Sequence, residues 1–193
     1  MYYLIIILSC MLGISLVDYF FVSLLQGIGF FEILLGVTIT TVAVIIIDAI
    51  FALIIRRCLP SKWFGVDKEW FRAGRRESKF YEKLGIKTWK DKVLELGAFT
   101  GFRKNKIVSP NDNLYVGRYI IEANYGVLIH LVDVLVGFLV IFIFPVKVWF
   151  CFGFPVAIVN AFLNWLPLMV LRYNLKKLHV LYRINKKRAE NSN

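Results

Sequence analysis

Charged residues are scarce in this chain. Asp, Glu, Lys and Arg make up 19% of its 193 residues, while 59% are hydrophobic and 16% are aromatic. A soluble domain is about 25% charged and roughly 45–50% apolar, so the composition excludes both an ordinary cytosolic domain and a disordered chain. The sequence predicts a membrane protein.

Cysteines and the familiar catalytic motifs are also scarce. The 3 cysteines are Cys10 and Cys151, which lie in apolar runs, and Cys58. Their odd number and their spacing support neither a disulfide framework nor a zinc site. The sequence has no G-x-S-x-G, H-E-x-x-H, Walker A or dinucleotide-binding motif, which argues against the enzyme classes that use them.

Long apolar runs are what the chain has instead. Each is longer than the roughly 20 residues that cross a bilayer core; they occupy residues 2–25, 30–55, 119–146 and 148–171. The sequence therefore predicts an all-α membrane protein with four transmembrane helices in two hairpins. We expect an N-terminal hairpin, a central segment, a second hairpin and a tail, at residues 1–55, 56–118, 119–171 and 172–193.

Positive charge is concentrated in the central segment and the tail. The chain has 24 Lys and Arg against 13 Asp and Glu, and residues 56–118 hold 16 of these bases and 7 of these acids. Lys and Arg in short loops stay on the cytoplasmic side of a membrane. We therefore expect the central segment, the tail and both termini to be cytoplasmic, in a multi-pass protein of the cell membrane.

Aromatic residues are interleaved with bases throughout the central segment. This pattern is typical of amphipathic helices in the headgroup layer, where Trp acts as an anchor and Lys and Arg meet anionic lipids. Nucleic-acid binding is disfavoured because the segment is tethered to the bilayer at both ends. We expect a helix over residues 77–96 with a break near Gly85, and a capped turn over residues 109–113.

The third predicted span carries polar residues on one face. Ionisable groups in a membrane helix are costly and usually mark a functional interior. His130 has a carboxylate three residues away, Asp133, which can orient the imidazole while its other nitrogen accepts a proton, as in a general base. The alternative is a structural hydrogen bond from His130. A single membrane His with distant carboxylates does not predict a metal site. The residues that share this face are Glu122, Gly126, His130, Asp133 and Gly137.

Further polar residues are expected at the depth of His130. Asn164 lies about 12 Å inward of Arg172 along a helix, and Asp48 lies about 12 Å inward of Arg56. A basic residue at a cytoplasmic helix end is ordinary, so Arg172 alone needs no special explanation, whereas the two asparagines inside the span, Asn160 and Asn164, do. Together these residues indicate a membrane-embedded polar site that is open to the cytoplasm.

Three motifs follow one another along residues 79–183. They are Phe80 and Tyr81 with the run Ile86, Lys87, Thr88, Trp89, Lys90, Asp91 and Lys92, followed by Phe102 and Lys104; Tyr119 to Glu122 with His130 eight residues later; and Asn164 eight residues before Arg172, Tyr173 and Asn174, with Leu178 beyond. In this order and spacing the chain resembles the glycosyl-4,4′-diaponeurosporenoate acyltransferases. These are small membrane enzymes that attach a fatty acyl chain to a glycosylated carotenoid.

The resemblance implies an O-acyltransferase that moves a fatty acyl group from a thioester to a hydroxyl of a lipid or glycosylated lipid. Acyl-CoA or another acyl thioester would be the co-substrate, no cofactor would be bound, and membrane lipids and a lipid-like acceptor would be the partners. His130 would be the general base, and Glu122 or Asp133 would orient it. Asn164 would donate to the developing oxyanion. The residues implied in substrate binding are Trp89, Lys90, Lys104, Asn164, Arg172, Tyr173 and Asn174.

A non-enzymatic membrane protein is the alternative hypothesis. In an assembly or packing subunit, the buried polar groups would only fix the helix packing. A carrier is less favoured because the sequence shows no inverted repeat of the kind that transporters use. A packing role predicts that replacing His130 lowers stability and function together.

Overall fold

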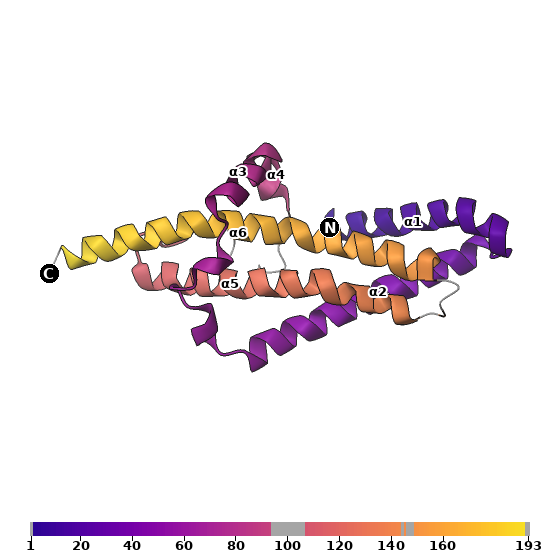
Figure 1. Cartoon of the computed structure of the whole chain (residues 1–193), viewed down its shortest axis with the longest axis horizontal. Helices are drawn as coiled ribbons and strands as arrows, with labels where there is room; N and C mark the ends of the chain where they lie inside the picture. The colour runs from indigo at the N-terminus through magenta and orange to yellow at the C-terminus, as the bar shows by residue number, and fades with distance from the viewer. Residues whose placement is uncertain (1, 94–106, 144, 146–148, 192–193) are drawn as a thin grey trace. The chain divides into compact units, whose positions relative to one another are not determined.

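The computed structural model describes residues 2–93, 107–143, 145 and 149–191, and these contain helices and no strand (Figure 1). This confirms the predicted all-α class. The long helices are α1 (Tyr2–Gln26), α2 (Phe30–Cys58), α5 (Asn113–Val136) and α6 (Phe154–Glu190). A 3-10 helix, η5 (Gly137–Ile143), continues α5, and a π-helical turn, η7 (Trp149–Gly153), precedes α6.

Three helices in the described parts of the chain are long and apolar enough to cross a membrane, whereas the sequence predicted four. They are Phe30–Cys58, Asn113–Ile143 and Cys151–Glu190. The first predicted span, in α1, is the exception. The apolar part of α1 whose side chains are described, Ile5–Phe21, falls among the shorter apolar helices of 10–17 residues. That is less than the roughly 20 residues that a bilayer core requires, so the prediction of four spans is corrected to three.

The chain folds into two compact units. Unit 1 contains Met1–Leu53 and Val132–Asn164, and unit 2 contains Ile54–Leu131 and Trp165–Asn193. The helices α2, α5 and α6 therefore each contribute residues to both units. We describe each unit by itself.

Unit 1 has an apolar core built mainly from α2 and the start of α6. Side chains that point away from this core, such as Leu35 and Ile46, are more than half exposed, as expected for a surface that faces lipid rather than water. Gly36 allows a close helix approach, because a Cβ there would lie 3.0 Å from the ring of Phe152. The buried core residues are Ile33, Val37, Val44, Val140, Cys151, Phe152, Val156 and Ala157.

In unit 2, the segment after α2 packs against α5 and α6. Phe64 is 1% exposed and stacks on Tyr125 of α5 with ring centroids 3.7 Å apart. A second cluster joins Tyr81 and Ile86 to Met169 of α6. The short helices of this segment are η1 (Ser61–Phe64), η2 (Glu69–Phe71), α3 (Arg75–Lys83), α4 (Ile86–Trp89) and η3 (Lys90–Lys92).

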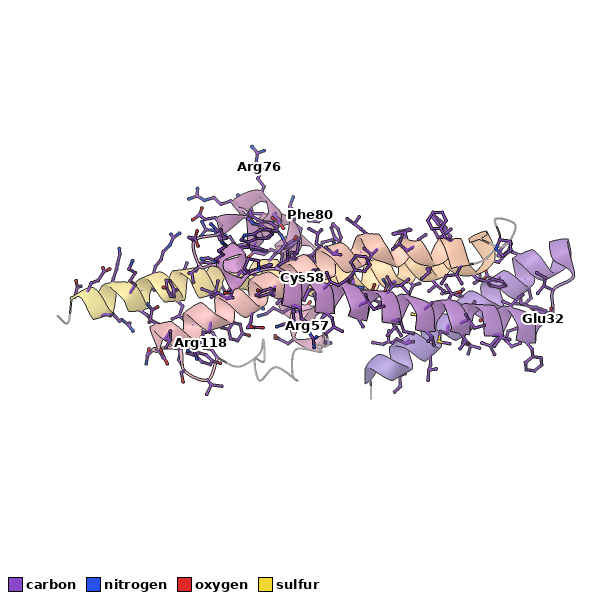
Figure 2. All side chains as sticks on the ribbon, turned by 90° about the horizontal axis from the view of Figure 1, so that it is seen from below. Glu32, Arg57, Cys58, Arg76, Phe80 and Arg118 are labelled. Atoms are coloured by element: carbon purple, nitrogen blue, oxygen red, sulfur yellow. The ribbon has the colours of Figure 1, made fainter. Side chains whose placement is uncertain are left out.

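Several aromatic residues expected in the headgroup layer are thus core residues of unit 2. Phe64, Phe71 and Tyr81 are buried, whereas Trp63 and Phe80 are 55% exposed. Figure 2 shows the neighbouring Arg76 pointing outward from α3. The sequence pattern did not separate these two groups, because a folded segment and a helix that lies on a membrane surface both interleave aromatic and basic residues.

Two local predictions are confirmed. Gly85 adopts φ 70°, a left-handed conformation that separates α3 from α4 and that favours glycine. Asp112 caps α5, because its Oδ1 accepts hydrogen bonds from the backbone N–H groups of Leu114 at 2.9 Å and Tyr115 at 3.1 Å.

The cap predicts a stability change. We expect Asp112→Ala to lower the free energy of unfolding by about 0.5–2 kcal/mol, because two N–H groups in the first turn of α5 lose their acceptor. Asp112→Asn keeps an acceptor oxygen and should lose much less. Thermal unfolding in detergent micelles, followed by circular dichroism, measures both. Equal losses in the two variants would contradict a capping role.

Candidate functional site

The residues predicted for the site lie on four elements. Glu122, His130 and Asp133 are on α5, Trp89 ends α4, and Lys90 begins η3. Lys104 lies outside the described residues. The remaining predicted residues, Asn164, Arg172, Tyr173 and Asn174, are on α6.

A polar cluster lies within the apolar unit 1; we call it the Asp48 cluster, and it consists of Asp48, Asp133, Asn160 and Asn164. The Nδ2 of Asn164 donates to Asp48 Oδ2 at 3.1 Å and to the Oδ1 and backbone oxygen of Asn160, each at 3.3 Å. The Nδ2 of Asn160 donates to the backbone oxygen of Asp133 at 3.5 Å. The structure thus brings together Asp48 and Asn164, which the sequence placed at a common depth.

Both carboxylates of the Asp48 cluster keep acceptor capacity. Oδ1 of Asp48 and Oδ1 of Asp133 are buried without a hydrogen-bond partner in the described structure, and Asp133 is only 4% exposed. Buried polar atoms are normally satisfied, so an exception calls for an explanation such as a functional role. Each of these two carboxylate oxygens can accept a hydrogen bond from a hydroxyl or bind a proton.

Gly137 lets η5 approach the Asp48 cluster. A Cβ at this position would collide with Nδ2 of Asn160 and would lie 3.4 Å from Val44 Cγ2. Gly13 of α1 is different, because a Cβ there meets nothing within 4 Å.

We therefore expect Gly137→Ala to lower the free energy of unfolding by about 1–3 kcal/mol, as overpacking of a filled interior does. The matched change Gly13→Ala should leave stability unchanged or raise it slightly, because Ala favours a helix. Thermal unfolding of both variants tests the close approach. Equal stability of the two variants would show that Gly137 has room for a side chain.

His130 and Glu122 have different surroundings. His130 is half-buried on α5, one turn before Asp133 on the same helical face. Glu122 lies two turns earlier and forms an ion pair with Arg56, with Nη2 and Oε2 2.9 Å apart. The structure thus engages Glu122 with a cation that the sequence analysis did not assign to it.

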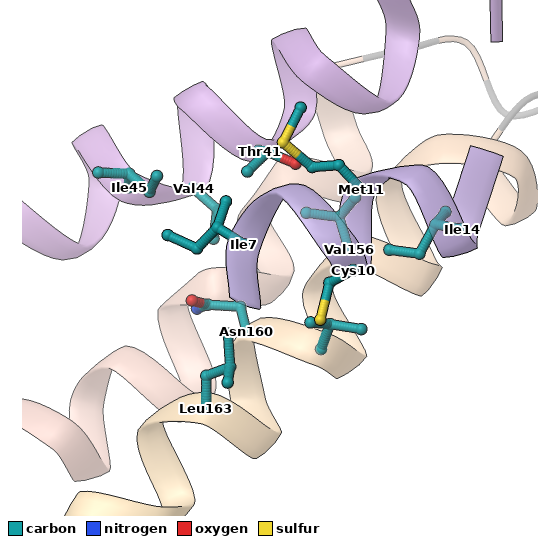
Figure 3. A pocket seen from close by; sticks show the side chains of 11 residues that line it. Ile7, Cys10, Met11, Ile14, Thr41, Val44, Ile45, Val156, Asn160 and Leu163 are labelled. Carbon is teal, nitrogen blue, oxygen red and sulfur yellow. The ribbon is translucent and has the colours of Figure 1, made fainter. Parts of the chain in front are cut away.

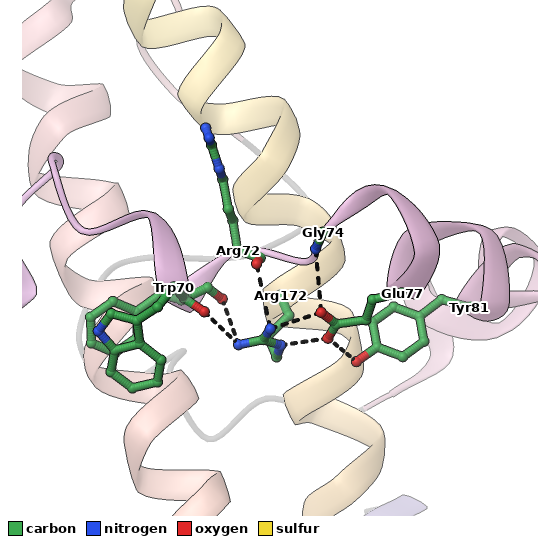
Figure 4. Close-up of polar contacts among 7 residues, drawn as sticks. Trp70, Arg72, Gly74, Glu77, Tyr81 and Arg172 are labelled. Carbon is green, nitrogen blue, oxygen red and sulfur yellow. Dashed lines mark hydrogen bonds and ion pairs between the residues drawn. The ribbon is translucent and has the colours of Figure 1, made fainter.

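Arg172 is the centre of a second polar arrangement, in unit 2, which we call the Arg172 clamp (Figure 4). Its Nε and Nη2 donate to the two carboxylate oxygens of Glu77 at 2.6 and 2.8 Å. The remaining N–H groups donate to the backbone oxygens of Trp70 at 2.8 Å, Phe71 at 3.3 Å and Arg72 at 3.4 Å. These five bonds match the five donors of a guanidinium. The clamp holds the segment between η2 and α3 on α6.

The clamp also shifts the ionisation of its members. Hydrogen bonds from Arg172 hold the pKa of Glu77 below its usual range, and bonds from Tyr81 and the Gly74 backbone add to this effect. The pKa of Tyr81 is raised, first by burial and then by the adjacent Glu77. Glu77 is therefore ionised and Tyr81 is neutral near pH 7.

Three other predicted binding residues, Trp89, Lys90 and Tyr173, contact side chains or backbone of unit 2. The hydroxyl of Tyr173 donates to Glu82 Oε1 at 2.9 Å, and Trp89 Nε1 donates to the backbone oxygen of Leu84 at 2.9 Å. Lys90 Nζ lies 3.9 Å from Asp91. Asn174 is half-buried.

The sequence analysis missed Glu77 and gave Asn160 no role. Glu77 is separated from Arg172 by 95 positions, so no local pattern linked them. Asn160 stands one turn before Asn164 on α6; the sequence analysis noted both amides in the span but assigned a role to Asn164 alone. Within the described residues, no three His, Cys, Asp or Glu side chains gather as a metal site.

The shifted pKa of Glu77 predicts a pH dependence. A carboxyl whose folded pKa is depressed stabilises the fold above its unfolded pKa, about 4.3 for Glu, and this contribution is lost as the pH falls through the folded value. We expect the unfolding temperature of the wild type to fall between about pH 5 and 3, and that of Glu77→Gln to fall less. Glu190→Gln, at an exposed site, is the control and should follow the wild type. An unchanged pH profile in Glu77→Gln would contradict the clamp.

Comparison with known protein families identifies the family of this chain. Residues 60–184, well over half of the chain, match the family model described as glycosyl-4,4′-diaponeurosporenoate acyltransferase. The chain belongs to this acyltransferase family. The match confirms the resemblance seen in the sequence. Comparisons with curated proteins and with solved structures each give no match.

The family match places some of the polar groups inside the shared region and others outside it. The matched residues include His130, the Arg172 clamp and most of the Asp48 cluster. Asp48 itself, and the whole of α1 and α2, precede residue 60. The family match therefore covers α5, most of α6 and the segment that packs on them. It supports an acyltransferase role for the chain.

Proposed function

We propose that this protein is a membrane-embedded O-acyltransferase. It moves a fatty acyl group from a thioester donor, such as acyl-CoA, to a hydroxyl of a glycosylated, carotenoid-like lipid acceptor. The observation that carries the proposal is the family match over residues 60–184, which contains a membrane histidine one helical turn from a buried carboxylate. Three helices with the length and composition of membrane spans supply a setting for lipid substrates.

The proposed reaction needs a base for the acceptor hydroxyl. His130 takes the hydroxyl proton while the oxygen attacks the thioester carbonyl, the C–S bond breaks, and the departing sulfur receives the proton as a thiol. Of the two carboxylates predicted to orient His130, Asp133 is favoured. Glu122 is engaged with Arg56, whereas Asp133 is buried and has an oxygen without a partner.

The proposed stabilisation of the tetrahedral intermediate uses an amide. Asn164 is the candidate, since preorganised N–H groups are the usual donors to an oxyanion. Support comes from Asp48 and Asn160, whose oxygens fix the orientation of the Asn164 amide. An oxyanion would replace one of the two Asn160 oxygens, which accept from Asn164 Nδ2 at 3.3 Å.

Donor binding is proposed at cytoplasmic cations and aromatic residues. Lys90 suits the phosphates of acyl-CoA, and from the sequence so does Lys104. Arg172 was predicted in the same role, but its five donors already meet Glu77 and three backbone oxygens. Its role in donor binding therefore stays a prediction from the sequence. We further propose a location in the cell membrane, with both termini in the cytoplasm and anionic lipid against the exposed bases.

The two histidines of the chain allow a matched test of the base. His130→Gln keeps a polar side chain but removes the titratable imidazole, so we expect turnover to fall about a hundredfold to ten-thousandfold. His179→Gln alters the second histidine, which lies beyond the predicted site on α6, and should retain turnover per folded molecule. Saturation curves with a labelled acyl thioester and purified protein measure this difference, beside thermal unfolding of each variant.

The same experiment separates catalysis from packing. If His130 only packs the helices, His130→Gln should lose stability and activity together. Normal turnover in folded His130→Gln protein would contradict the proposed site. Loss of turnover without loss of stability would contradict the packing hypothesis.

A further inference from the structure

Unit 1 contains an apolar groove beside the Asp48 cluster (Figure 3). It is formed by α1, α2 and α6, is partly open, and has a cavity volume of about 40 Å³. Side chains that line it include Ile7, Met11, Thr41, Ile45, Asn160 and Leu163. Nothing in the proposed chemistry uses this groove, and its α1 and α2 walls lie outside the family match.

The lining of the groove is mostly apolar and carries one amide. The hydroxyl of Thr41 already donates to the backbone oxygen of Val37 at 2.8 Å, so this residue presents its methyl group more readily than its oxygen. Asn160 is the lining residue with an amide, and it also belongs to the Asp48 cluster. An aliphatic ligand in the groove would thus have its polar head beside Asn160.

The lining favours a saturated lipid chain over a conjugated one. None of the described side chains that line the groove is aromatic, although 16% of the whole chain is Phe, Trp or Tyr. Flat conjugated ligands gain from stacking on aromatic rings, which this groove does not offer. Branched aliphatic side chains suit a flexible saturated chain, which takes the shape of the space available.

We propose that this groove binds the fatty acyl chain of the thioester donor, with the carbonyl end at Asn160. The inference rests on the proposed function, because the acyltransferase role is what selects a thioester over other lipids. The volume of the groove has room for roughly three water-sized groups, so the groove receives a short stretch of the chain. The rest of the chain extends out of the groove.

Two neighbouring residues of α2 provide a matched test. Ile45 lines the groove and Ile46 does not, yet both are about half exposed, at 48% and 52%. Ile45→Trp should fill the groove, whereas Ile46→Trp adds the same bulk to the outer surface. Each buried methylene contributes about fourfold to affinity, so displacing a few of them should weaken binding by at least about tenfold.

The probe is a palmitoyl thioester that carries a photoreactive diazirine on its chain, added to the full-length protein in phosphatidylcholine nanodiscs. We expect labelled peptides from α1 and α2 at the groove, with labelling reduced about tenfold or more in Ile45→Trp and unchanged in Ile46→Trp. Labelling outside the groove, or equal labelling of the two variants, would overturn the inference. Stronger labelling of the groove by a diazirine-bearing phosphatidylcholine would also overturn it, since the occupant would then be a structural lipid.

Transfer assays on the same proteins separate this inference from the proposed function. With donors of increasing chain length, the wild type should gain over the first few methylenes, which the groove holds, and Ile45→Trp should lose this gain while still using the shortest donors. Acyl transfer with the same chain-length preference in both proteins would overturn the groove and leave the acyltransferase intact. Specific groove labelling by the thioester, without transfer to any acceptor, would support the groove and overturn the proposed reaction.

Discussion

The bonds of one guanidinium hold together the part of the molecule that carries the family signature. Arg172 joins α6 to Glu77 and to three consecutive backbone carbonyls, at Trp70, Phe71 and Arg72. Those carbonyls lie at the end of η2, where a short helix leaves its last C=O groups without partners of its own. Because one planar cation satisfies them together with a carboxylate, the segment has a defined position on α6.

A different constraint acts on unit 1, where polar groups stand in an apolar surrounding. Asp48, Asn160 and Asn164 satisfy one another in part, and this mutual hydrogen bonding offsets the cost of placing amides and a carboxyl among aliphatic side chains. The satisfaction is incomplete at Asp48 and Asp133. Carboxylate oxygens without partners in an otherwise apolar interior can accept hydrogen bonds from the polar head of an apolar ligand.

The sequence predicted what depends on local chemistry. Apolar run length predicted the helical class, Gly85 marked the break between α3 and α4, and Asp112 marked the start of α5. Helical rise placed Asp48 and Asn164 at one depth, and they are bonded. It did not find the pairing of Arg172 with Glu77, because a contact across 95 positions leaves no periodic trace. The same limit applies to the aromatic residues between α2 and α5, of which the buried and exposed members look alike in sequence, and the count of four spans was too high.

Identification of the reaction product from the wild-type protein tests the central claim most directly. Purified protein in nanodiscs is incubated with an isotope-labelled palmitoyl thioester and a lipid extract that contains glycosylated carotenoids, and the lipids are then examined by mass spectrometry. The account predicts an acceptor that has gained one labelled acyl group in ester linkage, together with release of one free thiol per ester formed. Binding of the thioester without any labelled ester would contradict an acyltransferase and favour a packing or assembly role.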